Sequence, residues 1–438
     1  MKIGIIGGGV TGLTAAYELL KAGHEVTLFE AGSQLGGLAA GFRDPSWEWP
    51  LEKFYHHIFE SDTDIITLSA ELGLKDELIF PTPRTSILYE GEIYPFSNPV
   101  DWFKFPGYNF IDFLRFGFVG AFIRYTRFWR YLEKETAVSW TRRAYGRKIF
   151  ETSWKPLLIG KFGEYYDQVN MAWLWARLHA RSFKLGYFRG GFQAFVDTLA
   201  EAVRGLGGRI YTGQPVRGIR LQPTGGLQLS TADEEWTFEA VLSTTSPALL
   251  ARMAPDLPGA YLEELLNLRS MGAVVMTLAL RRPLMEQSQT YWLNVPAHSP
   301  RKEENPLPFL ALVEHTNYID RTHYGGDHIV YCGDYLPATH PYFQMSDDDL
   351  RELYLGSLRS INPEFSPDWV RRSWINRAAY AQPIPLVNHS QHIPAIQTPL
   401  SGLYFASMSQ VYPWDRGTNF AVQIGRRAAE EIKKSSNR

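Results

Sequence analysis

Cysteine, long apolar runs and charge of one sign are all scarce in this chain of 438 residues. Its one cysteine, Cys332, has no partner for an internal disulfide, which fits a reducing compartment and excludes a cysteine-based metal cluster. No run of about 18 apolar residues occurs, which excludes a membrane-spanning helix. The formal net charge of −2 provides no general attraction to nucleic acid. We therefore expect no metal and no nucleic-acid partner, and a small molecule as the ligand.

A secretory leader is also missing, because a strand pattern begins at Lys2 with no basic and apolar segment before it. The expected location is therefore cytoplasmic, with contact to a membrane surface left open. Hydrophobic residues make up 45% and charged residues 21% of the chain, as in an ordinary globular protein. The length favours two domains, which could be interleaved along the chain.

The N-terminal segment has the pattern of a βαβ unit. Apolar periodicity predicts a strand over Lys2 to Ile6, a helix that ends at Ala22, and a second strand over Glu25 to Glu30. Gly23 stops the helix, and a glycine-rich loop over Gly7 to Gly12 precedes it. A strand, a glycine loop and a helix in this order are typical of a Rossmann-type dinucleotide-binding domain.

Gly7, Gly9 and Gly12 form a Gly-x-Gly-x-x-Gly fingerprint, in which each glycine has a separate task. They allow a tight turn after the strand, close approach of a pyrophosphate to the backbone, and close packing of the helix on the strand. The phosphate would sit at the helix N-terminus, where free N–H groups and the helix dipole stabilise negative charge. Val10 and Thr11 complete this predicted phosphate-binding loop.

Glu30 stands at the end of the second strand, 23 residues after Gly7. A carboxylate in this place binds ribose hydroxyls and disfavours a 2′-phosphate, so NAD or FAD is preferred over NADP. The following segment, Ala31 to Phe42, reads AGSQLGGLAAGF and holds a second glycine pair, Gly36 and Gly37. In this the chain resembles the flavoprotein superfamily of amine oxidases, protoporphyrinogen oxidases and phytoene-type desaturases. The resemblance implies FAD as the cofactor, bound in part by Ala31, Gly36, Gly37 and Leu38.

Three later segments extend the resemblance. Arg189 to Ile219 is similar to the family's glycine-pair, helix and strand segment, which implies that Val216 contacts adenine. Val241 to Pro247 is similar to the family's strand that leads back to the cofactor, with Thr244 near it. Gly402 to Ile432 is similar to the C-terminal flavin segment.

The chain departs from the family after its last strand. Members commonly have Ala-Gly followed by Asp or Glu, whereas Ser407 and Met408 stand here, so the usual ribityl carboxylate is absent. Asp415 could replace it, or backbone N–H groups and the dipole of the last helix could bind the flavin without a carboxylate. We favour the second account, in which Met408 and the helix start contact the flavin. The helix start comprises Thr418, Asn419 and Phe420.

The second half of the chain gives further α/β signals. Gly190 and Gly191 precede a predicted helix with four apolar residues on one face: Phe192, Phe195, Leu199 and Val203. Short strands are predicted over four ranges: 209 to 211, 216 to 221, 227 to 230 and 236 to 241. Thr224, Gly225 and Gly226 supply a turn between the middle two.

Candidate catalytic residues are His57, Tyr380 and Trp414. His57, in EKFYHHIFESD, lies where the family's chain passes the flavin and resembles part of a flavin-proximal segment of UDP-galactopyranose mutases. Histidine exchanges protons readily near neutral pH, although a structural role for this one is equally open. His56 would face the opposite side. Tyr380 and Trp414, with Tyr412, could form aromatic walls over the flavin or could simply pack.

Residues 101 to 150 differ from the rest of the chain in composition. They include 16 aromatic residues, and ten Lys or Arg against four Asp or Glu. The segment could form an aromatic helical domain that walls a large pocket, an amphipathic surface that sits on lipid headgroups, or an aromatic core. Its basic residues could meet substrate carboxylates or anionic lipid.

We therefore predict an α/β fold: a Rossmann-type, GR2-like FAD-binding domain with an interleaved α+β substrate domain. The FAD-binding domain is assigned residues 1–75, 186–258 and 385–438. The substrate domain is assigned 76–185 and 259–384, including an aromatic helical segment over 101–180.

The predicted function is FAD-dependent dehydrogenation of a bulky, largely apolar substrate, protoporphyrinogen-like or isoprenoid-like, by hydride transfer to flavin N5. Amine oxidases tend to place a lysine near N5, and no lysine of this sequence can be assigned there, which disfavours simple amine oxidation. One alternative is a non-redox mutase similar to UDP-galactopyranose mutase, with arginines clamping a diphosphate. The available arginines are Arg124, Arg127, Arg142, Arg143 and Arg147. A second alternative is a flavin-bearing binding protein with vestigial activity.

Overall fold

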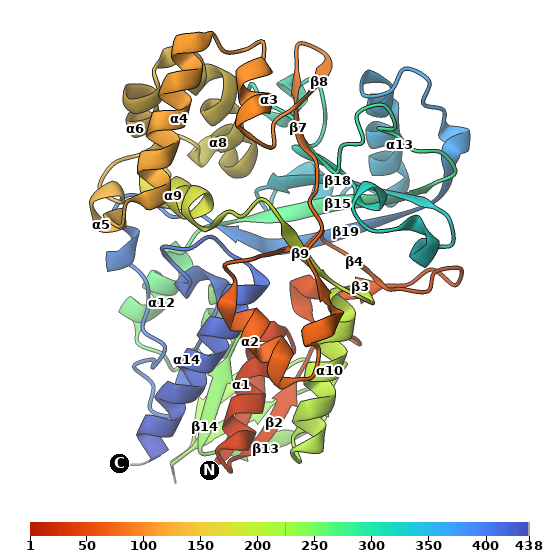
Figure 1. Ribbon diagram of the computed structural model, residues 1–438. Helices are drawn as coiled ribbons and strands as arrows, with labels where there is room; N and C mark the ends of the chain where they lie inside the picture. Colours follow the sequence, from red (N-terminus) through yellow and green to blue (C-terminus); the bar gives the residue numbers. More distant parts are fainter. Residues whose placement is uncertain (224, 437–438) are drawn as a thin grey trace.

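A five-stranded parallel sheet forms the lower half of the molecule in the computed structural model, which describes residues 1–223 and 225–436 (Figure 1). Its order is β10 (Arg209–Tyr211), β2 (Glu25–Phe29), β1 (Lys2–Ile6), β14 (Ala240–Ser243) and β20 (Leu403–Phe405). All four neighbouring pairs are parallel. The central strands are apolar and buried, as a parallel sheet covered on both faces requires. The predicted α/β class is confirmed.

Helices cover one face of this sheet. They are α1 (Val10–Lys21), α2 (Thr63–Glu71), α10 (Gly191–Gly205) and α14 (Thr418–Ser436). The predicted apolar face of α10 is buried together with Ile3 and Ile5 of β1. The hydrophobic core on this face of the parallel sheet lies between the sheet and these helices.

The other face of the sheet packs on a small antiparallel sheet of β11 (Gly218–Leu221), β12 (Leu227–Ser230) and β13 (Glu235–Phe238). Helices α11 (Pro247–Met253) and α12 (Gly259–Asn267) complete this layer. The strand predicted over 236 to 241 is wrong, because the chain leaves β13 at Glu239 and enters β14 of the parallel sheet. Thr224 of the predicted turn lies outside the described residues. Gly225 and Gly226 have φ of 87° and 85°.

A seven-stranded mixed sheet lies above the parallel one. Its order is β19 (Val370–Pro383), β15 (Ser270–Leu280), β18 (His328–Leu336), β17 (Ala311–Glu314), β16 (Trp292–Asn294), β7 (Thr85–Tyr89) and β8 (Glu92–Pro95). Helix α13 (Asp347–Ser357) packs against it. Cys332 is buried in β18 among apolar side chains. This sheet forms one wall of the region where the site is sought.

The aromatic segment is helical, as predicted, and lies at the upper left of Figure 1. It comprises α3 (Pro99–Lys104), α4 (Phe110–Tyr125), α5 (Trp129–Leu132), α6 (Ala137–Tyr145), α7 (Arg147–Ile149), a π-helical turn (Phe150–Trp154), α8 (Lys155–Phe162) and α9 (Met171–Ala180). Its interior holds the buried rings of Phe105, Tyr145, Phe162 and Trp173. The aromatic-core reading therefore accounts for part of the composition.

Short strands join the two halves. They are β3 (Gly41–Phe42) with β4 (Leu51–Glu52), and β9 (Leu185–Phe188) between β5 (Ile58–Phe59) and β6 (Leu78–Ile79). No helix among the described residues is long and apolar enough to cross a membrane. The carboxyl ends of the parallel strands point toward the seven-stranded sheet, so the region between the sheets is where a dinucleotide and its substrate would meet.

Candidate cofactor and substrate site

The glycine loop turns sharply at the carboxyl end of β1. Gly7 has φ of 110°, and its N–H donates to the Phe29 carbonyl of β2 at 2.8 Å. The Thr244 hydroxyl donates to the carbonyls of Ile6 and Gly7 at 3.0 and 3.2 Å. Thr244 therefore holds the glycine loop in place. Through these two hydrogen bonds Thr244 lies next to the predicted cofactor region.

Gly12 and Gly9 differ in what surrounds them. A Cβ added at Gly12 would lie 2.0 Å from the Gly7 carbonyl oxygen, so this glycine is needed for helix-to-strand packing. At Gly9 the φ is −76° and the nearest atom to an added Cβ is 3.9 Å away. The protein itself therefore leaves the space at Gly9 open, as a group that approaches the backbone would need. This space fits a pyrophosphate at the start of α1.

The second glycine pair lies directly against the first loop. The Gly36 N–H donates to the Gly8 carbonyl at 2.8 Å, and Gly36 bridges Gly9 as in a parallel pair. Gly36 and Gly37 have φ of 115° and 59°. Together the two loops form a slot lined by backbone. Beside it Leu38 is half-buried and Ala31 exposed.

Glu30 lies at the end of this slot where the ribose is predicted to bind. Its carboxylate accepts from the N–H groups of Gly8 and Gly32, both at 2.7 Å. Its carbonyl accepts from the Gln214 N–H at 2.9 Å, which brings Val216 to the same edge of the sheet, half-buried. The predicted adenosine residues therefore come together from two distant stretches of the chain.

The start of α14 supplies the predicted backbone donors. The first helical hydrogen bond runs from Ala421 N–H to the Gly417 carbonyl, so the N–H groups of the three residues between them precede it. Thr418 and Asn419 are buried. The Asn419 side chain accepts from the Ile65 N–H of α2 at 3.1 Å, which leaves its backbone as the group available to a ligand. Met408 lies half-buried in the preceding loop.

Asp415 is occupied by protein donors. It accepts from Arg177 at 2.8 Å, Gln382 at 3.1 Å and the Trp173 indole at 3.2 Å. Although burial opposes ionisation, the neighbouring Arg177, Arg416 and Lys161 hold the Asp415 pKa below its usual range. The carboxylate is thus committed to these partners, which agrees with our preference for backbone N–H groups at the flavin.

Lys161 of α8 is buried beside this carboxylate. Its Nζ lies 4.1 Å from the centroid of the Tyr335 ring, and the Arg416 guanidinium lies 4.9 Å from the same centroid and bonds the Tyr335 hydroxyl. Among the described residues, no carboxylate oxygen lies within 4.0 Å of Lys161. Burial above all, and then Arg177 and Arg416, lower its pKa well below the usual value.

We name Lys161, Arg177, Asp415 and Arg416 the buried charge cluster, in which Lys161 is buried and the other three side chains are half-buried. It sets three basic side chains against one carboxylate, because the nearby Asp334 is already paired with Lys302 at 2.5 Å. Positive charge on these basic groups is costly to hold away from water unless an anion completes the cluster. The cluster therefore has the chemistry of an anion-binding site.

His57 lies near the cluster with one ring nitrogen free. Its Nδ1 is buried and, among the described residues, has no hydrogen-bond partner. Burial first, and then Arg181, His56, Arg177 and Lys161, lower its pKa to about 3, so the ring is neutral near pH 7. His56 turns to the opposite side, toward Phe192, and its Nδ1 meets the Phe54 carbonyl. The free nitrogen is a polar atom that a ligand could satisfy.

The two aromatic candidates have different surroundings. Trp414 stacks on Phe420 at the start of α14, with ring centroids 5.7 Å apart, and packs at a tilt against Trp175, with centroids 5.4 Å apart. The Tyr380 hydroxyl is held by Ser407 and Ser409 at 3.3 and 2.6 Å. Trp414 thus stands beside the predicted flavin donors, whereas Tyr380 ties β19 to the loop after β20.

Tyr412, considered above as an aromatic wall, is bound within the protein. Its hydroxyl donates to Glu133 at 3.0 Å and accepts from Asn170 at 3.1 Å. Its contacts are therefore those of a packing residue.

The arginines suggested for a clamp do not converge on this site. Arg124, Arg127, Arg142, Arg143 and Arg147 are all exposed. Arg143 pairs with Glu135, and Arg124 bonds carbonyl oxygens at the end of α9. The sequence reasoning missed the cations that do come together, which are Lys161, Arg177 and Arg416. The available signal was a lysine inside the apolar run that becomes α8.

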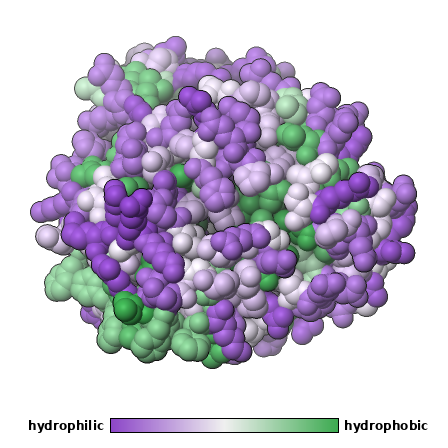
Figure 2. Space-filling model, turned by 90° about the horizontal axis from the view of Figure 1, so that it is seen from above, coloured by the Kyte–Doolittle hydropathy of each residue, from purple (hydrophilic) through white to green (hydrophobic). Residues whose placement is uncertain are grey.

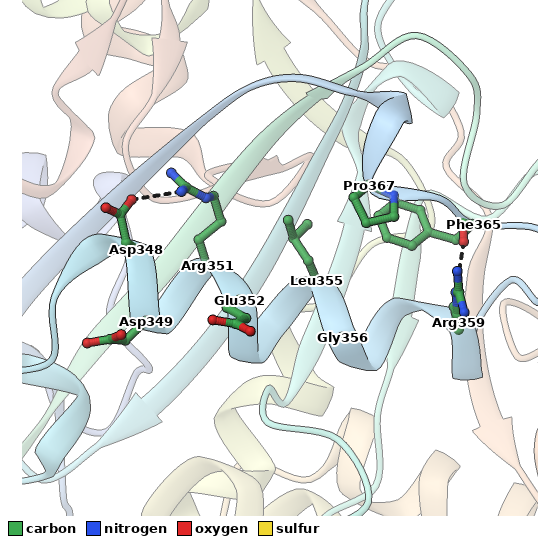
Figure 3. A pocket seen from close by; sticks show the side chains of 9 residues that line it. All are labelled: Asp348, Asp349, Arg351, Glu352, Leu355, Gly356, Arg359, Phe365 and Pro367. Atoms are coloured by element: carbon green, nitrogen blue, oxygen red, sulfur yellow. Dashed lines mark hydrogen bonds and ion pairs between the residues drawn. The ribbon is translucent and has the colours of Figure 1, made fainter.

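A second hollow lies far from the glycine loops, on the outer surface beside α13 (Figure 3). Five of its nine lining residues are charged, and Arg351 and Arg359 are bound to Asp348 and to the Phe365 carbonyl. It shares no residue with the slot or with the buried charge cluster. We do not consider it the functional site.

The fold and the slot define an α/β dinucleotide-binding protein, and comparisons with known proteins identify its family. A model for flavin-containing amine oxidoreductases matches residues 10–433. Bovine flavin-containing amine oxidase A is 22% identical over 98% of this chain and 84% of its own length. Tobacco mitochondrial protoporphyrinogen oxidase is 26% identical over 39% of this chain and 34% of its own. The alignment with the tobacco protein thus spans about a third of that relative.

Solved structures agree in fold. A putative protoporphyrinogen oxidase from Exiguobacterium has a TM-score of 0.76 at 20% identity, with 99% of each chain covered. A reduced UDP-galactopyranose mutase has a TM-score of 0.73 at 16% identity, with 99% of this chain and 96% of the other covered. The chain belongs to the flavin-containing amine oxidoreductase family, and the protein is an FAD-dependent oxidoreductase.

Proposed function

We propose that this protein dehydrogenates a bulky, largely apolar substrate that carries an anionic group, as a porphyrinogen with carboxylate side chains does. The observation that carries the proposal is Lys161, a buried lysine without a carboxylate partner among the described residues, set against the Tyr335 ring. An isoprenoid hydrocarbon has no group to pair with it. A carboxylate-bearing substrate would complete the cluster.

Aromatic side chains support the apolar part of the proposal. Tyr55 packs edge-on against Trp292 with ring centroids 4.9 Å apart, and its ring also approaches Gly333 beside Tyr335. Trp414 and Phe420 add a stacked pair at the start of α14. Such rings bind large apolar ligands and exclude water.

The roles of this chain's residues follow from their chemistry. The two glycine loops and Glu30 would hold FAD, which when bound supplies the hydride acceptor. The buried charge cluster would orient the substrate through its anion. His57, neutral and with a free Nδ1, would accept a hydrogen bond from the substrate. Trp414 would wall the cavity, and Tyr380 would hold the Ser407 loop against it.

The test is the visible spectrum of the purified protein, followed by anaerobic addition of protoporphyrinogen, phytoene and simple amines in turn. We expect the porphyrinogen to bleach the flavin and phytoene to leave it oxidised. Bleaching by phytoene alone would support an apolar substrate but overturn the anionic group. Bleaching by simple amines alone would overturn the bulky substrate altogether.

A second candidate is a rearrangement of a nucleotide sugar without net oxidation. The same three cations would suit a diphosphate, and this observation favours it. The same experiment includes UDP-galactofuranose. Turnover of this sugar only after reduction by dithionite would establish the mutase, and no turnover would exclude it for this sugar.

A further inference from the structure

Exposed apolar side chains are concentrated in one short part of the chain. Of the fifteen large hydrophobic residues that are exposed in the described chain, ten lie between Val100 and Tyr131. Scattered exposed hydrophobic residues need no explanation, but a contiguous group indicates an interaction surface. This group therefore requires a partner.

Helix α4 presents most of these residues on one side. They follow one another at intervals of three and four: Ile111, Leu114, Phe118, Phe122 and Tyr125. We name this set the α4 face. Phe118 is 76% exposed and Tyr125 80%. Phe116 and Ile123, on the other side of the helix, are buried in the protein. The helix is thus apolar on both sides, and only one side is covered.

A groove continues the α4 face. It is lined almost entirely by apolar groups from α4, α5 and α6: Phe122, Thr126, Phe128, Tyr131, Leu132 and Trp140. Figure 2 shows hydrophobic side chains gathered at its lower left edge, on the side where Figure 1 has α4 and α5. Face and groove together form one apolar area.

Positive charge surrounds this apolar area. All ten Lys and Arg residues of the segment from 101 to 150 are exposed, whereas none of its four acidic residues is. Two of the ten pair with local carboxylates, Arg143 with Glu135 and Lys148 with Asp112. The net surface charge of the segment is therefore strongly positive.

We propose that the α4 face and its groove dock on an anionic lipid surface, without crossing it. Apolar and aromatic side chains ringed by Lys and Arg match acyl chains beneath negatively charged headgroups. A second copy of this chain would bring two positive surfaces together, which like-charge repulsion opposes. This inference goes beyond the proposed function and does not depend on it.

The surface also lies close to the candidate site. The Trp175 indole of α9 donates to the Thr126 carbonyl at 2.9 Å, and Thr126 lines the groove. The same Trp175 ring packs on Trp414. One aromatic residue thus separates the docking surface from the wall at the start of α14, so a bilayer-dissolved substrate would be released beside the site.

Co-sedimentation of the FAD-bound protein with vesicles tests the proposal. We expect it to pellet with vesicles of equal parts phosphatidylcholine and phosphatidylglycerol at low salt. Pure phosphatidylcholine should bind at least tenfold more weakly, and high salt should release the protein. Failure to pellet with the anionic vesicles at low salt would overturn the proposal.

Matched variants separate this surface from others. The triple change I111S/F118S/Y125S should weaken vesicle binding at least tenfold, whereas L206S/L266S/L353S, which removes exposed leucines elsewhere, should leave it unchanged. R127E/R130E should abolish binding at low salt, and R204E/R209E should not. Bound FAD and helical content establish that each variant is folded.

Light scattering on the same samples shows whether a second copy of this chain, and not a lipid surface, covers the α4 face. A wild-type dimer that the triple change dissociates, without vesicle binding, would assign the face to a second copy and overturn the proposal. A monomer that binds anionic vesicles through the face would support it.

Discussion

The buried charge cluster and the slot between the glycine loops are built in opposite ways. The slot is built from backbone, and the space at Gly9 is open where a side chain would otherwise stand. The cluster is built from long charged side chains that arrive from α8, α9 and the loop before α14. The slot therefore depends on the absence of side chains, and the cluster on their presence.

This difference teaches which changes each region tolerates. A backbone site is blocked by any added atom but has few side chains to lose. A side-chain site is weakened by removal of one group, and the groups left behind can become uncompensated buried charges. Variants that fill the slot, change a buried carboxylate outside both regions, or remove a charged side chain from the cluster test this contrast.

The largest effect is expected for Gly9→Val. The backbone at Gly9 accepts a side chain without strain and no protein atom clashes with an added Cβ, so the chain should fold. The side chain would occupy the pyrophosphate position, and we expect FAD to bind at least a thousandfold more weakly, about 4 kcal/mol. Flavin absorbance of the purified protein measures this.

Gly205→Val is the control, because a Cβ added there meets no atom within 4 Å at the far end of α10. It should retain FAD fully. Stoichiometric FAD in the Gly9 variant would show that the slot is not where the pyrophosphate binds.

A pH effect is expected at Glu52 of β4, one of the short strands that join the two halves of the molecule. Burial raises the Glu52 pKa from 4.5 to about 7, although the Phe192 N–H and the Tyr187 hydroxyl stabilise the carboxylate. The folded chain therefore keeps a proton between pH 4.5 and 7 that the unfolded chain loses. Stability from this group is complete below pH 4.5 and is lost as pH rises through 7, by about 3 kcal/mol.

Glu52→Gln should remove this dependence, since the amide does not titrate and still accepts from the Phe192 N–H. Urea midpoints at pH 5 and 8 should differ less in the variant than in the wild type. Glu314, whose pKa burial also raises to about 7, contributes in the same direction to both proteins. An equal pH dependence in both would refute the assignment, and exposed Glu92→Gln serves as control.

Lys161→Met should weaken the cluster while leaving the slot intact. Loss of one charge-assisted contact is expected to lower kcat/KM about a hundredfold, or about 2.7 kcal/mol, mainly through KM. Steady-state kinetics with the substrate that bleaches the flavin measures this. Lys155→Met on the same helix, where the lysine pairs with Glu151 at the surface, should change little.

Unchanged KM in the Lys161 variant, with FAD retained, would mean that no substrate anion binds there. Loss of FAD instead would place Lys161 in the cofactor site and remove the contrast between the regions.

The smallest effect is expected for Glu30→Ala, at roughly 1 to 3 kcal/mol in FAD affinity, the scale of a charge-assisted hydrogen bond. The change removes a ribose contact and the two bonds that hold Gly8 and Gly32. A fluorescence titration of the apoprotein with FAD measures the affinity. An unaltered dissociation constant would exclude Glu30 as a ligand.

The parts of the fold that could be predicted were those encoded by neighbouring residues. The strand, loop and helix of residues 2 to 21 and the apolar face of α10 follow short-range rules. The strand over 236 to 241 was wrong because no glycine or proline between Trp236 and Val241 marks the point, at Glu239, where the chain changes sheets. Local patterns do not encode which sheet a strand joins.

The same limit separated the site residues. His57 and Trp414 were named from a resemblance, but their surroundings, a free Nδ1 and a stack on Phe420, depend on distant packing. The exposed arginines of residues 124 to 147 were suggested for a clamp because composition made them conspicuous. The three cations that converge are isolated in sequence.

The sequence by itself determined the cofactor slot, because a glycine's freedom and a helix N-terminus are local properties that nearby residues define. The tertiary structure alone decided that Lys161, Arg177 and Arg416 meet around one carboxylate. It also decided that one apolar side of α4 is buried in the protein and that the other apolar side is exposed. Both depend on contacts between segments far apart in the chain, and the free energy of burial acts only once those segments have packed.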